Sequence, residues 1–167
     1  MKKFILLPSL IVFMISSLHA QSDVPFQRKG KFIIETNYSF LSTVLGGSSG
    51  FGFVSGGGSS LLNIGVDFGK FTGNNFALKG SFGILNSEGS SITTFSLGFK
   101  GYIGGSFIIN PSGGIITDGD NVGILFGLHL GFAIKLANNI YLEPAFGARG
   151  DGDGILFEIR TPFMMLF

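Results

Sequence analysis

The residues of this chain that could carry out chemistry are ionisable side chains placed at alternate positions among apolar ones. The clearest example is His129, which lies between Leu128 and Leu130 in a segment where every second residue is apolar. A period of two places successive side chains on opposite faces of a β-strand. Histidine titrates near neutral pH and can act as a general base, but it needs a nucleophile within reach to support hydrolysis.

Eight charged residues share the face on which His129 lies. Four are acids and four are bases, and each alternates with large apolar neighbours. Charges gathered in a confined space are costly unless they are paired and hydrogen-bonded. We therefore expect interior ion pairs, with His129 paired to Glu143 or Glu158. The expected polar network consists of Glu35, Asp67, Lys79, Lys100, His129, Lys135, Glu143, Glu158 and Arg160.

Three further patterns are explained by turn and loop chemistry. Arg149-Gly150-Asp151 matches an adhesion tripeptide, but three such residues also form a turn. The Gly- and Ser-rich segment Ser42–Ser60 lacks the lysine and following helix of a phosphate-binding loop. Acids in the predicted loops could recruit divalent cations, but calcium requires carboxylates that converge on one point. We therefore interpret these acids as a solvated surface at the rim of the barrel, and we expect no metal or cofactor. These acids are Glu88, Asp118, Asp120, Asp151 and Asp153.

The N-terminus has the pattern of a secretory signal peptide. Two lysines precede an apolar run from Phe4 to Leu18, and the small residue Ala20 follows. The run is short for a transmembrane anchor and contains Pro8. The absence of cysteine excludes a lipoprotein anchor and a disulfide framework. We predict cleavage after Ala20, a periplasmic lead-in over 21–30 and a single domain over 31–167.

The composition excludes some classes of partner and favours a membrane protein. Removal of the leader changes the formal net charge from +1 to −1, because nine basic residues then face ten acidic ones. There is no basic field for nucleic acid. The chain contains 28 Gly and 20 Phe, only 13% of its residues are charged, and no second apolar run could form a helical span. A membrane β-barrel has this composition, because only half of each strand faces lipid.

Alternation recurs in eight segments of the mature chain. Each is about ten residues long, which suits a tilted strand crossing a membrane. Segment 42–60 is interpreted as a long loop, Gly104-Gly105 as a tight hairpin, and Pro111 as the site of a bulge or kink. The predicted strands cover about 31–41, 61–70, 76–85, 92–103, 106–116, 122–136, 140–149 and 155–167.

The composition of the less apolar face indicates which side points outward. That face is dominated by Gly, Ala, Ser and Asn, with roughly one charge per strand, whereas a water-facing exterior carries many more Lys and Glu. Small residues suit the crowded interior of an eight-stranded barrel. A lipocalin-like soluble barrel, with the opposite sense, is the alternative. We predict an all-β, eight-stranded antiparallel up-and-down transmembrane β-barrel, with short turns in the periplasm and 42–60 outside.

The leader, the strand pattern and the C-terminal aromatic together resemble a known family. The last strand ends at Phe167, with Phe163 and Met165 on the same face. In this respect the chain resembles the small outer-membrane β-barrels of Gram-negative bacteria, OmpA/OmpX-like and porin-like, and looks most like Bacteroidota members. The resemblance implies outer-membrane lipids as surroundings and Phe163, Met165 and Phe167 as a signal for the barrel-assembly machinery. Thr161-Pro162 interrupts that signal, and its usual glycine is missing.

The same resemblance raises three functional hypotheses. Some barrels of this kind deacylate lipid A with a lipid-facing His and Ser, but here His129 is on the inward face and Gly131 stands two residues ahead. We therefore predict no enzyme. The favoured function is a structural or surface-interaction barrel, a monomer with a plugged polar lumen, whose loop Ser42–Ser60 could contact a surface ligand. The alternative is a narrow porin for ions or small solutes.

Overall fold

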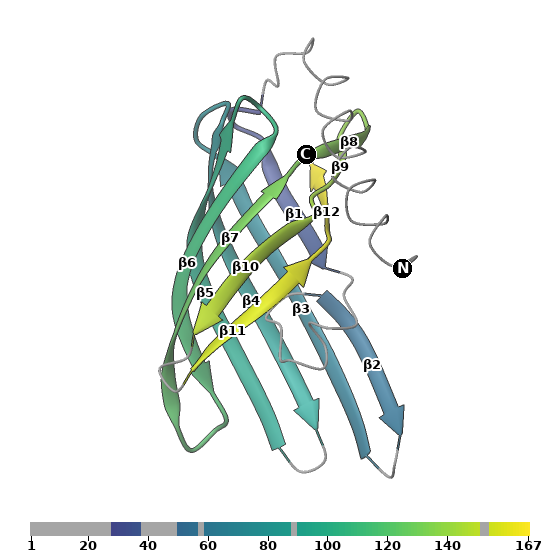
Figure 1. The fold of residues 1–167 in the computed structure, drawn as a ribbon, viewed down its shortest axis with the longest axis vertical. Helices are drawn as coiled ribbons and strands as arrows, with labels where there is room; N and C mark the ends of the chain where they lie inside the picture. Colours follow the sequence, from purple (N-terminus) through teal and green to yellow (C-terminus); the bar gives the residue numbers. More distant parts are fainter. Residues whose placement is uncertain (1–27, 38–49, 57–58, 88–89, 151–153) are drawn as a thin grey trace, which may run out of the picture.

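The protein is an all-β structure whose strands form one antiparallel sheet. The computed structural model describes residues 28–37, 50–56, 59–87, 90–150 and 154–167, and twelve β-strands lie within them (Figure 1). No helix within these ranges is long and apolar enough to cross a membrane. The strands are β1 (Phe32–Asn37), β2 (Gly50–Gly56), β3 (Ser59–Phe71), β4 (Phe76–Ser87), β5 (Ser90–Ile103), β6 (Phe107–Thr117), β7 (Val122–Phe132), β8 (Ile134–Ala137), β9 (Ile140–Leu142), β10 (Ala145–Gly150), β11 (Ile155–Arg160) and β12 (Pro162–Leu166).

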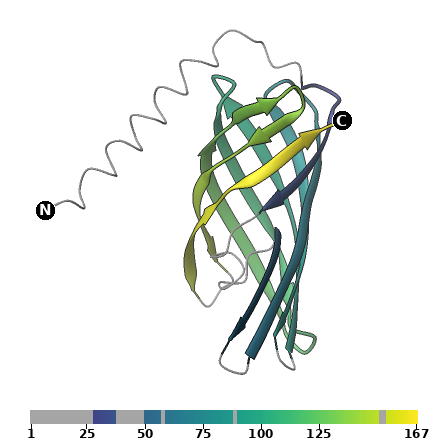
Figure 2. The same cartoon turned by 90° about the vertical axis from the view of Figure 1, so that its right-hand side faces the viewer.

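The sheet has up-and-down connectivity through its long strands. Strands β3 to β7 pair each with the next, and β7 pairs with β10, which pairs with β11. Strand β1 pairs with β3 on one edge and with β12 on the other. The tilted strands curve around an interior, as the two perpendicular views show (Figures 1 and 2).

Three of the segments predicted as continuous strands are divided. Ala133 separates β7 from β8, residues 143–144 separate β9 from β10, and Thr161 separates β11 from β12. Proline contributes no N–H to a ladder, and Pro144 and Pro162 stand at two of these breaks. Their carbonyls still accept: Pro144 O from the amide of Phe132 at 3.0 Å, and Pro162 O from that of Glu143 at 2.9 Å.

The interpretation of segment 42–60 as a loop is wrong for its second half. Residues 50–56 form β2, which pairs with 59–65 of β3. Here Phe51 and Phe53 are exposed and alternate with glycines. Glycine has a low β-propensity, so its abundance concealed a period of two that the rest of the chain shows clearly. The first half of the segment, 42–49, lies outside the described residues.

Two turn predictions have different outcomes. The hairpin at Gly104-Gly105 is confirmed: it joins β5 to β6, and both glycines have positive φ, 60° and 80°. Of the bulge or kink expected at Pro111, the bulge is wrong, because Gly98↔Ser112 and Gly101↔Ile109 keep one register on either side of it. Pairing with β5 instead lapses over two residues, while the ladder to β7 continues through Pro111↔Leu128.

The two faces of the sheet differ sharply in polarity. The outward face exposes large apolar side chains along every long strand, including Ile124 at 74%, Phe157 at 65% and Leu97 at 59%. The inward face buries eight charged residues and His129, together with an apolar cluster. That cluster is Ile33, Phe71, Ala77, Tyr102, Ile108, Ala133, Tyr141, Met164 and Leu166.

Candidate functional site

A buried polar network fills the middle of the interior. Its side chains come from β1, β3, β4, β5, β7 and β11 and from the break between β9 and β10. The pairing register aligns residues of neighbouring strands; Glu35 of β1, for example, stands opposite Asp67 of β3. Each is no more than 8% exposed. The residues are Glu35, Asp67, Lys79, Lys100, His129, Glu143, Glu158 and Arg160.

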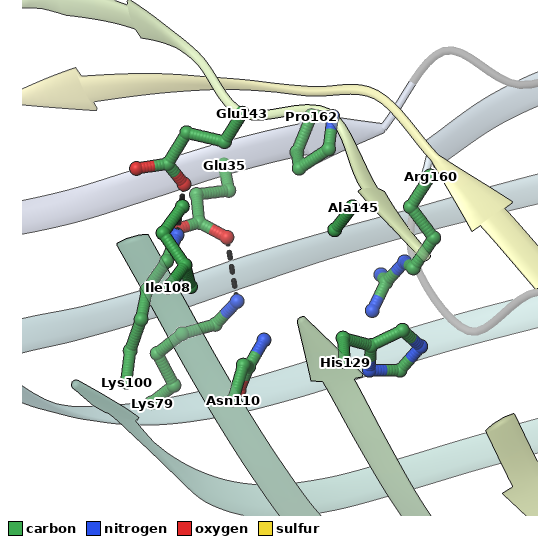
Figure 3. Close-up of a pocket in the computed structure, with 10 residues that line it drawn as sticks. All are labelled: Glu35, Lys79, Lys100, Ile108, Asn110, His129, Glu143, Ala145, Arg160 and Pro162. Atoms are coloured by element: carbon green, nitrogen blue, oxygen red, sulfur yellow. Dashed lines mark hydrogen bonds and ion pairs between the residues drawn. The ribbon is translucent and has the colours of Figure 1, made fainter. Parts of the chain in front are cut away.

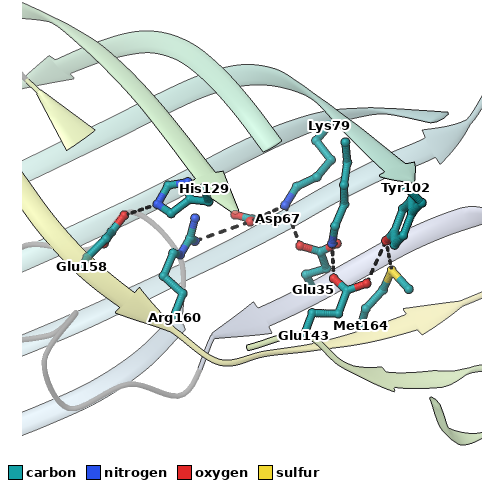
Figure 4. A network of polar contacts seen from close by, with 10 residues as sticks. Glu35, Asp67, Lys79, Tyr102, His129, Glu143, Glu158, Arg160 and Met164 are labelled. Carbon is teal, nitrogen blue, oxygen red and sulfur yellow. Dashed lines mark hydrogen bonds and ion pairs between the residues drawn. The ribbon is translucent and has the colours of Figure 1, made fainter. Parts of the chain in front are cut away.

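Two lysines each join two carboxylates in this network (Figure 4). Lys79 Nζ donates to Glu35 Oε2 at 2.5 Å and to Asp67 Oδ2 at 2.9 Å. Lys100 Nζ donates to the other oxygen of Glu35 and to Glu143. The result is a continuous chain of alternating charge, which is the arrangement that offsets the desolvation of buried ions.

A second cluster contains the histidine. His129 Nε2 lies 2.5 Å from Glu158 Oε1, and because a carboxylate only accepts, the imidazole donates. Arg160 Nη2 lies 3.7 Å from Asp67 Oδ2 and so connects this cluster to the lysine chain (Figure 4). In register, His129 faces Asn110 and Gly147, and neither of these is a nucleophile.

Two basic residues differ in burial from what the sequence suggested: Lys135 is only half-buried, and Arg28 is buried. Lys135 does not take part in the ion pairs above; it is half-buried on β8, in register with Tyr141. Arg28 is instead buried, at 1% exposure, although its position in a polar lead-in suggested a surface residue. With Arg28 included, the buried described residues carry four permanent positive charges against four carboxylates. The sequence signal that could have indicated Arg28 is Gly30, which marks a turn.

Glycines make room for the large polar side chains. Gly147 lies in register between His129 and Glu158. A Cβ placed there would meet His129 Cδ2 at 2.5 Å and Cγ at 2.8 Å, and would also meet the carbonyl oxygen of Leu128. Gly69 stands opposite Lys79, whose Cα and Cγ a Cβ would meet at 3.2 Å. These two inward positions are therefore glycine because the large side chains next to them leave no room for a Cβ atom.

Gly147→Ala is expected to destabilise the fold by about 1–3 kcal/mol, the usual effect of overpacking. The methyl group would displace the imidazole of His129 from its 2.5 Å contact with Glu158. The matched control is Gly73→Ala, where a Cβ would meet nothing within 4 Å. Urea unfolding of the lipid-reconstituted variants measures both. Equal stability of the two variants would show that the interior is not packed as described.

The space left among these side chains is small (Figure 3). A cavity of about 20 Å³ is bordered by the network and by Asn110 and Pro162, and a second of about 10 Å³ lies toward Ser96 and Ser112. One water molecule needs about 10–15 Å³ measured this way. Each of these two cavities therefore has room for about one water molecule between the charged groups.

The remaining predicted sites lie on the surface or outside the described residues. Phe163, Met165 and Phe167 point outward from the last strand, at 41%, 37% and 65% exposure. In the 118–121 loop, the carboxylate of Asp118 accepts from the amide of Asn121 at 2.8 Å, a contact that lowers the pKa of Asp118. Glu88, Asp151 and Asp153 are outside the described ranges, within which no group of three His, Asp or Glu could hold a metal.

Comparisons with known proteins identify one structural neighbour. No family model matches the chain, and no curated protein matches it significantly. Among solved structures, the chain is similar to the outer membrane protein Ail of Yersinia pestis in a phospholipid bilayer nanodisc. That similarity has a TM-score of 0.49 and 10% sequence identity, and covers 83% of this chain and 100% of the other. A similarity at this level carries no argument about function, so the function is inferred from the geometry above.

Proposed function

We propose that this protein is an integral outer-membrane β-barrel with a plugged polar interior and a structural or surface-interaction role. The observation that carries the proposal is the inverted polarity of the sheet. Soluble proteins rarely bury Lys, Glu or Arg unless these are paired, and they rarely expose large contiguous apolar surfaces. Here the buried described residues include four acids and four bases, while Phe, Leu and Ile cover the outside. Lipid is the solvent that suits such an exterior.

The pairing supports an eight-stranded barrel as the finer description. The three divided segments, β7–β8, β9–β10 and β11–β12, each occupy one place in the wall, because one or two residues separate their halves. Strands β1 and β2 share a single edge of β3, at 67–70 and 59–65. With β3 to β6 this makes eight places in the proposed wall, and the pairing of β1 with β12 is the contact that would close it into a ring. An eight-stranded barrel has an interior just wide enough for side chains.

Strand length fits the same proposal. Strand β5 has 14 residues. At a rise of about 3.3 Å per residue and a tilt of about 40°, it covers roughly 35 Å along the barrel axis, more than the apolar band of about 25 Å in outer-membrane barrels. The exposed apolar side chains of β5, from Phe95 to Ile103, lie within that span.

We further propose that the lumen does not conduct solutes. Purified protein in a planar bilayer is expected to give no large, stable conductance steps, and liposomes containing it are expected to swell no faster than empty ones. The physical reason is that the described gaps hold about one water each and are lined by paired charges. Liposomes with a general porin are the positive control. Reproducible steps from correctly folded protein would favour the narrow porin instead.

Contact and assembly roles belong to the outward-facing segments. We propose 42–60 as the contact element for a surface ligand, since β2 extends the sheet and exposes Phe51 and Phe53. We propose Phe163, Met165 and Phe167 as the signal for the assembly machinery, because Phe163 and Met165 are exposed on β12 and Phe167 is exposed directly after it. We propose no enzymatic role, since His129 is buried and its register partners, Asn110 and Gly147, offer no nucleophile.

A further inference from the structure

Three aromatic rings surround the guanidinium of Arg28 at the end of the interior that holds the apolar cluster. The Cζ atom of Arg28 lies 3.9 Å from the ring centroid of Tyr102, 5.4 Å from that of Tyr141 and 5.5 Å from that of Phe71. All four side chains are buried, with at most 3% exposed. The rings come from β5, β9 and β3, so the group that they enclose is held from several sides of the wall.

A short turn delivers Arg28 to this position. The amide of Lys31 donates to Arg28 O at 3.0 Å, which closes a four-residue turn, and the amide of Gly30 donates to Phe71 O at 2.8 Å. Gly30 has a φ of +86°, as the third residue of a type II turn requires, and a residue with a Cβ rarely adopts this angle. The chain therefore folds back at Gly30 and lies against the end of β3.

The chemistry of this enclosure suits a guanidinium better than an ammonium. A guanidinium is planar and weakly hydrated and can stack on aromatic faces, whereas an ammonium is compact and strongly hydrated. The enclosure also supplies an acceptor, because Arg28 Nη2 donates to Gly105 O at 3.2 Å. The hydroxyl of Tyr102 donates to Glu143 at 2.8 Å, which fixes the ring and places a carboxylate behind it.

We propose that Phe71, Tyr102 and Tyr141 form a guanidinium-binding cage, and that the chain's own Arg28 occupies it. Occupation fastens residues 28–31, directly before β1, to the wall at this end of the interior. The ligand class is a planar guanidinium cation, and the cage would accept a free one if Arg28 were removed. This proposal rests on the described contacts alone and does not require the lumen to be sealed or the exterior to face lipid.

Chemical rescue of Arg28→Ala tests the cage. Methylguanidinium chloride at millimolar concentrations is expected to raise the thermal midpoint of the variant and to change its tyrosine fluorescence saturably. Fluorescence is a sharp reporter, because the chain has no Trp and two of its three Tyr line the cage. Wild type is expected to respond at least tenfold less, because its cage is filled. Methylammonium at the same concentration is the matched control and is expected not to rescue.

A second variant separates the cage from a general salt effect. In Arg28→Ala/Tyr102→Leu, the apparent affinity for methylguanidinium is expected to fall by about tenfold or more, as loss of the nearest ring implies. Equal responses to the two cations, or an unchanged affinity in the double variant, would overturn the proposal. Heat-modifiable gel mobility of the same samples reports the barrel independently, so loss of the cage is distinguishable from failure of the fold.

Wild-type protein provides a test that needs no Arg28 variant. Phenylglyoxal, an arginine-selective reagent, is expected to modify Arg28 at least tenfold more slowly in the folded protein than in the heat-unfolded chain, with peptide mapping by mass spectrometry as the readout. Gly30→Ala is expected to speed the reaction in the folded state, because alanine at the positive φ of position 30 would strain the turn that holds Arg28. If Arg28 reacts equally fast in the folded and unfolded protein, the cage does not hold it and the proposal is wrong.

Discussion

Lys79→Met is expected to destabilise the folded protein by about 3–5 kcal/mol, the range seen when one partner of a buried ion pair is removed. Lys79 is 6% exposed, and its ammonium lies 2.5 Å from Glu35 and 2.9 Å from Asp67. Methionine fills a similar volume but leaves both carboxylates without their shared cation. Urea unfolding in lipid vesicles, followed by tyrosine fluorescence or gel mobility, measures the loss.

Two companion variants identify the cause of that loss. Lys79→Met/Asp67→Asn removes a positive and a negative charge together and is expected to recover much of the stability, since a neutralised pair leaves fewer uncompensated charges. Lys29→Met changes an exposed lysine and is expected to stay within about 0.5 kcal/mol of wild type. If Lys79→Met behaved like Lys29→Met, the interior would be hydrated rather than a packed ionic plug.

Leu97→Arg is expected to lower the free energy of unfolding in a bilayer by about 2–4 kcal/mol. This is the usual effect of an arginine on the lipid face of a membrane barrel at the bilayer midplane. Leu97 is 59% exposed near the middle of β5, and its register neighbours are Gly80 and Gly113, so no interior contact is lost when it changes. An exposed Leu→Arg change in a water-facing surface would be nearly neutral. Asn121→Arg, in the exposed 118–121 loop, is the matched control and is expected to be neutral.

Alternation within the sequence was sufficient to predict the faces of residues in long strands such as β7. In β7, for instance, Leu125 and His129 are buried while Ile124 and Leu128 are exposed, as a period of two requires. Successive side chains of a strand point to opposite faces, so the face that a residue takes can be predicted from a single sequence. The same reasoning placed Glu35 and Asp67 on the inward face, where both are buried.

Long-range features were not predictable in this way. At the Ala133 break the amide of Ala133 donates to Ser106 O, a contact between segments far apart in the sequence. Strand β2 depends on a pairing that glycine's low propensity concealed. Arg28 belongs to a polar stretch without periodicity, and only the fold shows three rings converging on it from distant strands. Lys135 has the inward parity but is only half-buried, in register with Tyr141, and the β8–β9 pairing becomes irregular directly after it.

Spin labels along β7 test the lipid-facing barrel most directly, because the chain contains no cysteine and each label needs only one substitution. Cysteines are introduced singly from Val122 to Phe132 and labelled in reconstituted vesicles. For a lipid-facing barrel we expect high oxygen and low nickel-chelate accessibility at Ile124, Phe126, Leu128 and Leu130, and low accessibility to both reagents at Leu125 and His129. Nickel-chelate accessibility as high at Leu128 as at Asp120 would place the apolar face in water and contradict it.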